Sequence, residues 1–428
     1  MKKILLSNIR KLLLAGLLTV GLLFSGFYCF LQKPQEPILD KQVTELVTEK
    51  HESIRVASLH GETIITEPVL LDLLKTPMME RLKGINQGGI CHYAKPDTPP
   101  FNRYEHSVDV FLLIRRYGGT LEEQMAALGH DASHTVFSHV GDIVFKNKDT
   151  KNSYQDNIHE SFLREHGISE VLAKHGYEIE DILHKSEGFS MLEKGLPDLC
   201  ADRIQYNYHT GYIDGLISAE HVKKGYKHLH FEDDIWFFDN AEDAARLARI
   251  SLYETINLWG AAWNLLTYDW TAQAMRRAMS IGLITVDDIH YDIQDDQMWE
   301  ILTRADDPMI KYMMHRVQHY QDQFSLISEE QFGALHNDHG IPCQNIQFKF
   351  RGVDPFVQTR NGLKRLTEID KLFSQEYNET KIQAKKGWFI LFKGADEKSE
   401  TEKALFAQAE ALIQEQEGDL EKKIVRLT

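Results

Sequence analysis

One stretch decides the fold, and it runs from Phe101 to His139: FNRYEHSVDVFLLIRRYGGTLEEQMAALGHDASHTVFSH. It holds four histidines among apolar residues that recur at helical spacing. The residues that share a helical face with His106, by the i, i+4, i+7 rule, are Val110, Leu113 and Tyr117. The pattern predicts a helix that carries His106 on an apolar face.

A second helix is predicted directly after the first. The pair Gly118-Gly119 interrupts the first helix, and Thr120 with Glu123 has the spacing of a capping box that opens the next one. The apolar positions of this second helix place the pair His130-Asp131 at its C-terminal end. Two neighbouring helices can therefore point their imidazoles and a carboxylate at one spot.

These side chains have the chemistry of a metal site. Imidazole and carboxylate ligands together suit a borderline to hard divalent cation, which could be Mn, Fe, Ni, Zn or Mg. A single histidine on an apolar helix face is more often an ordinary core residue, and that is the alternative for each histidine alone. Burying the whole cluster without an ion would cost several kcal/mol, so the sequence favours a bound cation.

A later segment, LPDLCADRIQYNYHTG from Leu196 to Gly211, supplies further acidic candidates. Asp198 and Asp202 stand one helical turn apart, as do Asp202 and Tyr206. Either aspartate could complete a metal shell, although aspartates followed by arginine are often in surface ion pairs. The residues alone leave this choice open.

Composition bounds the class of protein. The chain has 428 residues, of which 43% are hydrophobic, so it can bury a sizeable core. Its net charge of −16, from 48 basic and 64 acidic residues, argues against a broad nucleic-acid surface. The cysteines are too few and too scattered for a disulfide framework or a thiolate metal site: Cys29, Cys91, Cys200 and Cys343.

The N-terminus predicts a membrane anchor. Four basic residues among the first 11 precede an apolar run at residues 12–31, which is long enough to span a bilayer. Basic residues before the span predict a cytoplasmic N-terminus at residues 1–11 and an extracytoplasmic catalytic part. A cleaved signal peptide is the alternative. Residues 32–50 are polar and are expected to form a linker.

The rest of the chain divides by pattern into a mainly helical domain at residues 51–330 and an α+β region at 331–428. At the start of the helical domain, the segment that contains Gly61 alternates like a short hairpin. The pair His159-Glu160 is expected to begin a helix. Helical residues 240–283 are expected to serve the core or an interface between copies of the chain, so a homo-oligomer is among the expectations.

The α+β region is predicted from two aromatic-rich runs. NIQFKFRGVDPFV and KIQAKKGWFILFK predict strands, and Ser399 with Glu402 predicts a final helix to Gly418. A basic cluster in this region has two interpretations, and its members are Lys349, Arg351, Arg360 and Lys364. A solvated face is the more common meaning of such a cluster, and a contact with a phosphate or nucleotide is the alternative.

Several motifs, taken in order, resemble one known family. They are HGETIITEPVLLDLLKTPMMERLKGINQ, RYEH, HDASHTVFSH, IHES and ADRIQYNY. His106, then His130-Asp131, then a distant aspartate is similar to the signature of the HD-domain metal-dependent phosphohydrolases. The full set resembles their deoxynucleoside triphosphate triphosphohydrolase branch, which includes the bacterial dGTP triphosphohydrolases and the sterile-alpha-motif-and-HD-domain dNTPase. The resemblance covers residues 57 to 215 well and continues weakly to about residue 330.

The resemblance implies roles for individual residues. It implies that the metal is held by His106, His130, Asp131 and Asp202, which selects Asp202 over Asp198. It implies that His159, with Glu160 beside it, donates a proton to the leaving group, and that Asp131 also helps to position the attacking water. The residues that it places on the substrate are Arg103, His134, His139, Tyr206, Arg203 and Gln87, the last against the sugar.

The implied fold is therefore a mainly α HD-domain structure with an N-terminal transmembrane helix and a small α+β C-terminal appendix. The implied partner is a small phosphorylated substrate, and the leading hypothesis is a deoxynucleoside triphosphate cleaved to deoxynucleoside and triphosphate. Hydrolysis of a nucleoside monophosphate or another phosphoester is one alternative. A membrane-tethered nucleotide-binding protein with little turnover is the other.

Overall fold

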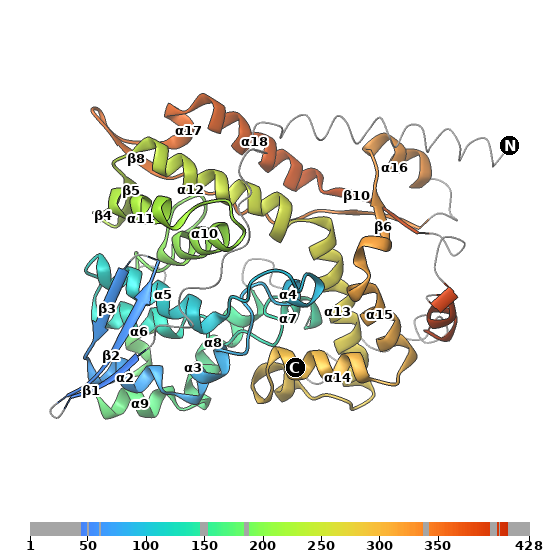
Figure 1. Ribbon diagram of the computed structural model, residues 1–428, viewed down its shortest axis with the longest axis horizontal. Coiled ribbons are helices and arrows are strands. Elements are labelled where there is room, and N and C mark those ends of the chain that lie inside the picture. The colour runs from blue at the N-terminus through green and yellow to red at the C-terminus, as the bar shows by residue number, and fades with distance from the viewer. Residues whose placement is uncertain are drawn as a thin grey trace.

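The structure is a computed structural model that describes residues 44–48, 51–59, 61–145, 153–183, 188–336, 342–393, 400–401 and 403–409. It is mainly helical with three small sheets, as the sequence predicts (Figure 1). Within these residues, no helix combines the length and the apolar character that crossing a bilayer requires. The predicted anchor at residues 12–31 lies outside the described residues and stays a prediction.

The first half of the chain contains helices α2 (Pro68–Leu74), α3 (Pro77–Leu82), α4 (Cys91–Ala94), α5 (Arg103–Arg116), α6 (Leu121–Gly129), α7 (Val140–Val144), α8 (Tyr154–Glu165), α9 (Ile168–Lys174) and α10 (Ala201–Ile213). The second half contains α11 (Ala219–His228), α12 (Ala241–Glu254), α13 (Ala262–Ser280), α14 (Asp295–Arg304), α15 (Pro308–Gln318), α16 (Glu329–His336), α17 (Leu366–Ile369) and α18 (Lys371–Lys386). A π-helical turn at Thr255–Trp259 joins α12 to α13.

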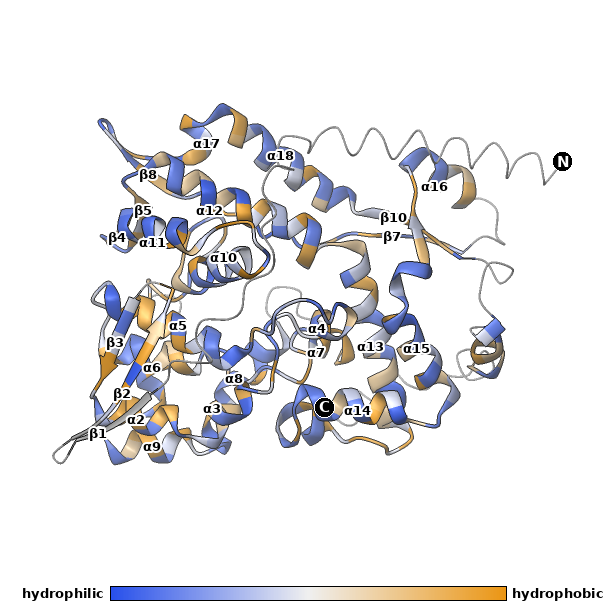
Figure 2. Cartoon of the chain, viewed as in Figure 1, coloured by the Kyte–Doolittle hydropathy of each residue, from blue (hydrophilic) through white to orange (hydrophobic). Residues whose placement is uncertain are grey.

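An antiparallel sheet comes first and confirms the predicted hairpin around Gly61. Its strands are β1 (Thr44–Thr48), β2 (His51–Ser58) and β3 (Gly61–Ile65), in that order. Ile54 on β2 pairs with Ile65 on β3, and both side chains are buried in the larger of two hydrophobic cores. Figure 2 shows hydrophobic residues gathered where β2, α2, α5 and α6 lie together.

Helices α5 and α6 form where their caps predict. Asn102 and Glu105 make a full capping box at the start of α5, and Gly118, with φ of +80°, follows its end. Thr120 caps α6 by accepting from the Glu123 amide, but the return half of the predicted capping box is absent from the hydrogen bonds of these described residues. The Glu123 carboxylate instead accepts from the amides of residues 191 and 192, which ties α6 to the segment before α10.

The C-terminal strands join sheets that begin in the middle of the chain. The first sheet has the order β4 (Leu229–Glu232), β5 (Ile235–Phe238), β8 (Phe356–Thr359) and β9 (Gly362–Arg365), and β8 runs parallel to β5. The second has the order β6 (Phe324–Leu326), β10 (Trp388–Phe392) and β7 (Cys343–Ile346). Helix α18 packs on α12. The region after residue 331 is therefore built into the helical body rather than appended to it.

Both strand predictions in this region are wrong in part. Of NIQFKFRGVDPFV, only residues 345–346 and 356–357 lie in strands, in β7 and β8 respectively. Residues 381–386, predicted as strand, complete helix α18, and β10 begins only at Trp388. Asp370 caps the start of α18, and Gly387 ends it with φ of +74°. Of the predicted last helix, residues 400–401 and 403–409 are helical and the remainder lies outside the described residues.

Asp295, the first residue of α14, joins three segments of the chain. Its buried carboxylate accepts from the amide of Asn86 at 2.8 Å and from the amide of Phe137 at 2.7 Å. Burial raises the pKa of this carboxyl to about 6, against the lowering by these hydrogen bonds. The carboxylate thus fixes two loops, before α4 and before α7, relative to α14.

We predict that Asp295→Asn lowers the free energy of unfolding by about 1–3 kcal/mol, because the amide nitrogen cannot accept from a backbone N–H that would be left unpaired. The midpoint of urea unfolding, followed by helical circular dichroism at pH 8, measures this. The matched control is Asp296→Asn, an exposed neighbour that accepts from the Tyr93 hydroxyl and can still do so as an amide. Equal midpoints of urea unfolding for the two variants would show that the Asp295 carboxylate does not stabilise the fold through these loops.

Candidate metal centre and adjoining cavity

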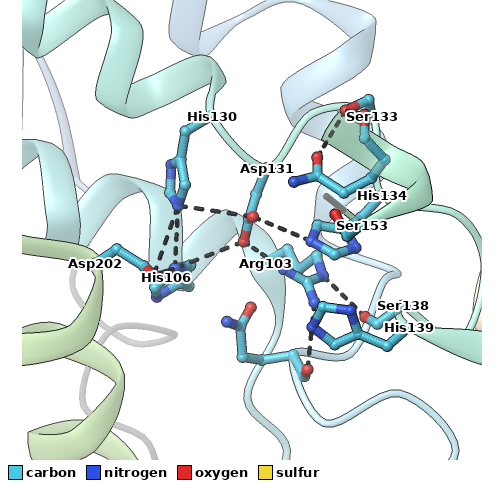
Figure 3. Close-up of polar contacts among 12 residues, drawn as sticks. Arg103, His106, His130, Asp131, Ser133, His134, Ser138, His139, Ser153 and Asp202 are labelled. Carbon is cyan, nitrogen blue, oxygen red and sulfur yellow. Dashed lines mark hydrogen bonds and ion pairs between the residues drawn. The ribbon is translucent and has the colours of Figure 1, made fainter. Parts of the chain in front are cut away.

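Three helices bring four predicted metal ligands together. His106 comes from α5, His130 and Asp131 from the end of α6, and Asp202 from the first turn of α10. Figure 3 shows the two imidazoles and the two carboxylates facing one another, with Arg103 on the far side of Asp131. The structure thus places Asp202 in this group. Asp198, the alternative, lies before α10 and pairs with Arg365.

The ligand atoms of His106, His130 and Asp202 all lie within 4.8 Å of one another, and Asp131 lies beside both imidazoles. His106 Nε2 lies 2.9 Å from Asp202 Oδ1, 3.2 Å from His130 Nε2 and 3.5 Å from Asp131 Oδ2. His130 Nε2 lies 3.7 Å from Asp131 Oδ1 and 3.9 Å from Asp202 Oδ1. Ligands about 2.1 Å from a shared cation stand roughly 3.0–3.4 Å apart, so small shifts would seat a divalent ion here. The residues present fit the implied metal.

Hydrogen bonds from behind orient both imidazoles. His106 Nδ1 lies 2.5 Å from Gln205 Oε1, and His130 Nδ1 lies 2.7 Å from the carbonyl of Ala127. These oxygens can only accept, so each Nδ1 donates, and in the neutral ring each Nε2 has a lone pair for a cation. When its Nε2 is protonated, His106 instead donates to Asp202. Gln205 Nε2 in turn donates to Asp109 Oδ2 at 3.0 Å, which fixes the amide orientation. Two buried side chains, Gln205 and Asp109, therefore stand behind His106.

The charges keep the carboxylates ionised. Burial acts to raise the pKa of Asp131, but the charges of Arg103 and the neighbouring histidines hold it well below the usual range. Burial likewise opposes ionisation of Asp202, and the hydrogen bond from His106 lowers its pKa overall. Ionised carboxylates are the form that binds a cation, so the pair is ready to serve as ligands.

Arg103 connects the metal centre to a cavity. Its buried guanidinium forms an ion pair with Asp131, and its Nε donates to Ser138 Oγ at 2.8 Å. Ser138 Oγ donates to the carbonyl of Asn86 at 2.6 Å. Phe137 and Ser138 both have φ of +54°, a conformation that costs non-glycine residues energy and is common at functional sites.

We call the adjoining space the Arg103 cavity; its volume is about 340 Å³. Four of the predicted substrate residues line it: Gln87, Arg103, His139 and Tyr206. Its wall also includes Asn86, Gly88, Cys91, His92, Thr98, Pro99, Phe101, Asp142, Ile143, Thr210, Ile213, Asp214, Leu258, Trp259, Asn264, Leu265, Tyr268, Lys349 and Arg351. The volume is in the range of small-molecule sites.

Two other predicted substrate residues are engaged elsewhere. His134 Nε2 lies 3.3 Å from Asp131 Oδ1, and burial, followed by the charge of Arg103, lowers the pKa of His134 to about 3. His134 is thus a neutral ring that supports Asp131 and does not line the Arg103 cavity. Arg203 pairs with Glu193 at 2.9 Å and also lies outside the cavity wall.

The predicted proton donor and its neighbour face different ways. His159 lies within α8, not at its start as predicted, and its Nδ1 is 3.0 Å from Ser133 Oγ, two residues beyond Asp131. Glu160 is exposed and pairs with Arg164 at 2.8 Å. A helical step of about 100° per residue separates the two side chains, so the structure does not bring Glu160 to the centre.

Some residues of the site had no clear signal in the sequence. Gln205 stands three residues after Asp202 and so shares its helical face, which is the one hint that it could act behind a ligand. Lys349 and Arg351 belong to the predicted basic cluster, and only the structure shows that they, unlike Arg360 and Lys364, line the Arg103 cavity.

Comparison with known proteins agrees with this geometry. The chain is 36% identical over 221 residues to the uncharacterized protein YdhJ of Bacillus subtilis, covering 52% of this chain and 67% of YdhJ. It is 30% identical over 266 residues to the metal-dependent phosphohydrolase cns2 of Cordyceps militaris, covering 61% of this chain and 76% of cns2. The chain belongs to the HD-domain metal-dependent phosphohydrolases.

Two further likenesses concern the branch and the fold of this phosphohydrolase. It is 30% identical over 151 residues to the deoxynucleoside triphosphate triphosphohydrolase SAMHD1 of Bos taurus, covering 30% of this chain and 25% of SAMHD1. Its fold resembles a phosphohydrolase from Bacteroides thetaiotaomicron, with a TM-score of 0.60 at 13% identity over 79% of this chain and 99% of the other. No protein-family profile matches the phosphohydrolase chain.

We predict that Gln205→Leu in this phosphohydrolase weakens binding of a divalent metal by about 10–100-fold, because His106 Nδ1 loses the acceptor that orients the ring. Competition with a chromophoric chelator measures the affinity. Tyr208→Phe is the matched control on the same helix, since its buried hydroxyl has no hydrogen-bond partner among the described residues. Undiminished metal affinity in Gln205→Leu would show that the hydrogen bond from His106 to Gln205 is not needed to orient His106.

Proposed function

We propose that this phosphohydrolase acts on a nucleotide and cleaves a deoxynucleoside triphosphate to a deoxynucleoside and triphosphate. The observation that carries the proposal is the Arg103 cavity, which begins at a guanidinium in contact with a metal ligand. The likeness to SAMHD1 over part of its length supports the same substrate class.

The wall of the cavity carries two kinds of side chain, one cationic or titratable and one aromatic. Arg103, His139, Lys349 and Arg351 supply cationic or titratable groups, as binding of phosphates requires. Phe101, Trp259 and Tyr268 supply aromatic surface, as binding of a nucleoside requires. The buried amide oxygen of Gln87 has no hydrogen-bond partner among the described residues, so a hydroxyl or amino group of a bound nucleoside could satisfy it.

Different residues of this chain then have different roles in the proposed reaction. His106, His130, Asp131 and Asp202 would hold the divalent ion, which when bound polarises a phosphoryl oxygen and lowers the pKa of a bound water. Arg103, fixed by Asp131 and Ser138, neutralises the phosphate oxygens next to that centre.

His159 is the proposed proton donor. Ser133 Oγ donates to Gln155, so its lone pair accepts from His159 Nδ1–H and fixes the ring. In the doubly protonated ring, His159 Nε2 then carries the proton that passes to the leaving group, and the ring is left neutral with its proton on Nδ1.

A screen of the full-length chain against nucleotides tests the substrate. Each of Mn, Fe, Ni, Zn and Mg is supplied in turn with deoxynucleoside triphosphates, ribonucleoside triphosphates and nucleoside monophosphates. We expect deoxynucleoside and inorganic triphosphate as the products, resolved by chromatography. Release of orthophosphate from monophosphates alone would instead identify another phosphoesterase, and turnover of none of these substrates would refute the proposal.

We predict that His159→Ala lowers kcat about 10²–10⁴-fold while metal content stays unchanged, because a proton-transfer group is lost without loss of a ligand. Metal analysis and steady-state kinetics measure the two effects. Glu160→Gln should keep kcat within about twofold, since this exposed carboxylate pairs with Arg164. A large loss in Glu160→Gln would restore the assisting role that the family resemblance implies.

A further inference from the structure

The segment between β7 and β8 carries alternating aromatic and basic residues. Its sequence from Gln347 to Gly352 is QFKFRG. The contacts of these side chains divide them into an aromatic side, Phe348 and Phe350, and a basic side, Lys349 and Arg351.

The aromatic side is firmly packed. Phe348 stacks on Trp388 with ring centroids 5.6 Å apart, and Phe350 meets Tyr377 of α18 edge-on at 5.0 Å. A Cβ added to Gly260 would overlap the Phe348 ring, which shows how closely that ring approaches the turn after Trp259. The two phenylalanines therefore anchor the segment against the wall of the Arg103 cavity.

The basic side faces the cavity. Lys349 and Arg351 both line it, with Lys349 exposed and Arg351 partly buried. Within the described residues, neither side chain has a hydrogen-bond or ion-pair partner, whereas Arg103 pairs with Asp131 and His139 pairs with Asp142. Two neighbouring cations thus line the cavity without a direct ion pair to a carboxylate of the described residues.

The two cations share the wall of the cavity with Arg103 and His139. The charge of Arg351, followed by burial, lowers the pKa of Lys349, and the charges of Asp142 and Asp156 act in the opposite direction. Burial raises the pKa of Tyr268 well above its ordinary value, and Arg103 and Arg351 both oppose this rise.

We propose that Lys349 and Arg351 form a second anion-binding subsite, which takes the phosphates of a nucleoside polyphosphate beyond the one at the metal centre. The proposal rests on the proposed function and specifies its substrate class. Unpaired cations at a cavity wall repel each other, and a bound phosphate chain relieves this repulsion while accepting charge-assisted hydrogen bonds. A monophosphate lacks the further phosphates that this pair would bind, so the subsite selects triphosphates over monophosphates.

The test compares two basic pairs from the same region of the chain. Lys349→Gln/Arg351→Gln removes the cavity pair, and Arg360→Gln/Lys364→Gln removes an equal charge from the β8–β9 hairpin, whose residues do not line the cavity. We expect the cavity variant to raise the KM for a deoxynucleoside triphosphate at least about tenfold, with the KM for a monophosphate changed less than about twofold. The hairpin variant should change neither, and Lys349→Arg should retain the preference for triphosphate.

A binding measurement separates this proposal from the proposed function. Calorimetry with the metal-loaded, full-length chain compares inorganic tripolyphosphate with orthophosphate. A preference for tripolyphosphate that only the cavity variant loses supports the subsite even if no nucleotide is hydrolysed. Nucleotide hydrolysis with an unchanged KM in the cavity variant would overturn the subsite and leave the proposed function standing. Circular dichroism and metal content confirm that the cavity variant is folded.

Discussion

The hydrogen-bonded chain from Asp109 through Gln205 to His106 is the constraint on which the metal centre depends. It joins α5 to α10 inside the core, where each unpaired polar group would be costly. Because Gln205 and Asp202 lie on one face of α10, the contact that orients His106 also sets Asp202 2.9 Å from its Nε2. A shift of α10 along α5 would break the hydrogen bonds and separate the ligands together.

Arg103 links the metal centre to the cavity through side chains that hold its guanidinium in place. Its ion pair with Asp131 and its hydrogen bond to Ser138 leave the guanidinium in a single orientation. Ser138 holds that position in a left-handed backbone conformation, and the Phe137 amide is fixed in turn by Asp295. Elements as distant in sequence as α5, α7 and α14 therefore cooperate in aiming one positive charge.

The sequence predicts local secondary structure but not the contacts between distant segments. Helices α5 and α6 follow from caps and apolar periodicity, and their histidines follow from the same spacing. The strand prediction for residues 381–386 is wrong because the aromatic run after Gly387 dominates the local pattern, while Asp370 starts a helix that includes them.

Contacts between distant segments lie beyond such reasoning. Nothing in the order of residues links Asp295 to Phe137, or distinguishes Lys349 and Arg351 from Arg360 and Lys364. Glu160 follows His159 directly in the sequence, but its side chain lies on the exposed surface and pairs with Arg164. The family resemblance implies the metal ligands, whereas the residues of the cavity wall come together only in the folded chain.

The parallel pairing of β8 with β5 has a consequence for the order of assembly. During synthesis the ribosome releases α5, α6 and α10 well before the segment that carries Arg351, so the ion-binding set can form while the cavity still lacks one wall. Parallel pairing between strands more than a hundred residues apart closes a large loop, which is intrinsically slow. A nascent chain would therefore acquire its metal early and its full substrate selectivity only after its last third has been made.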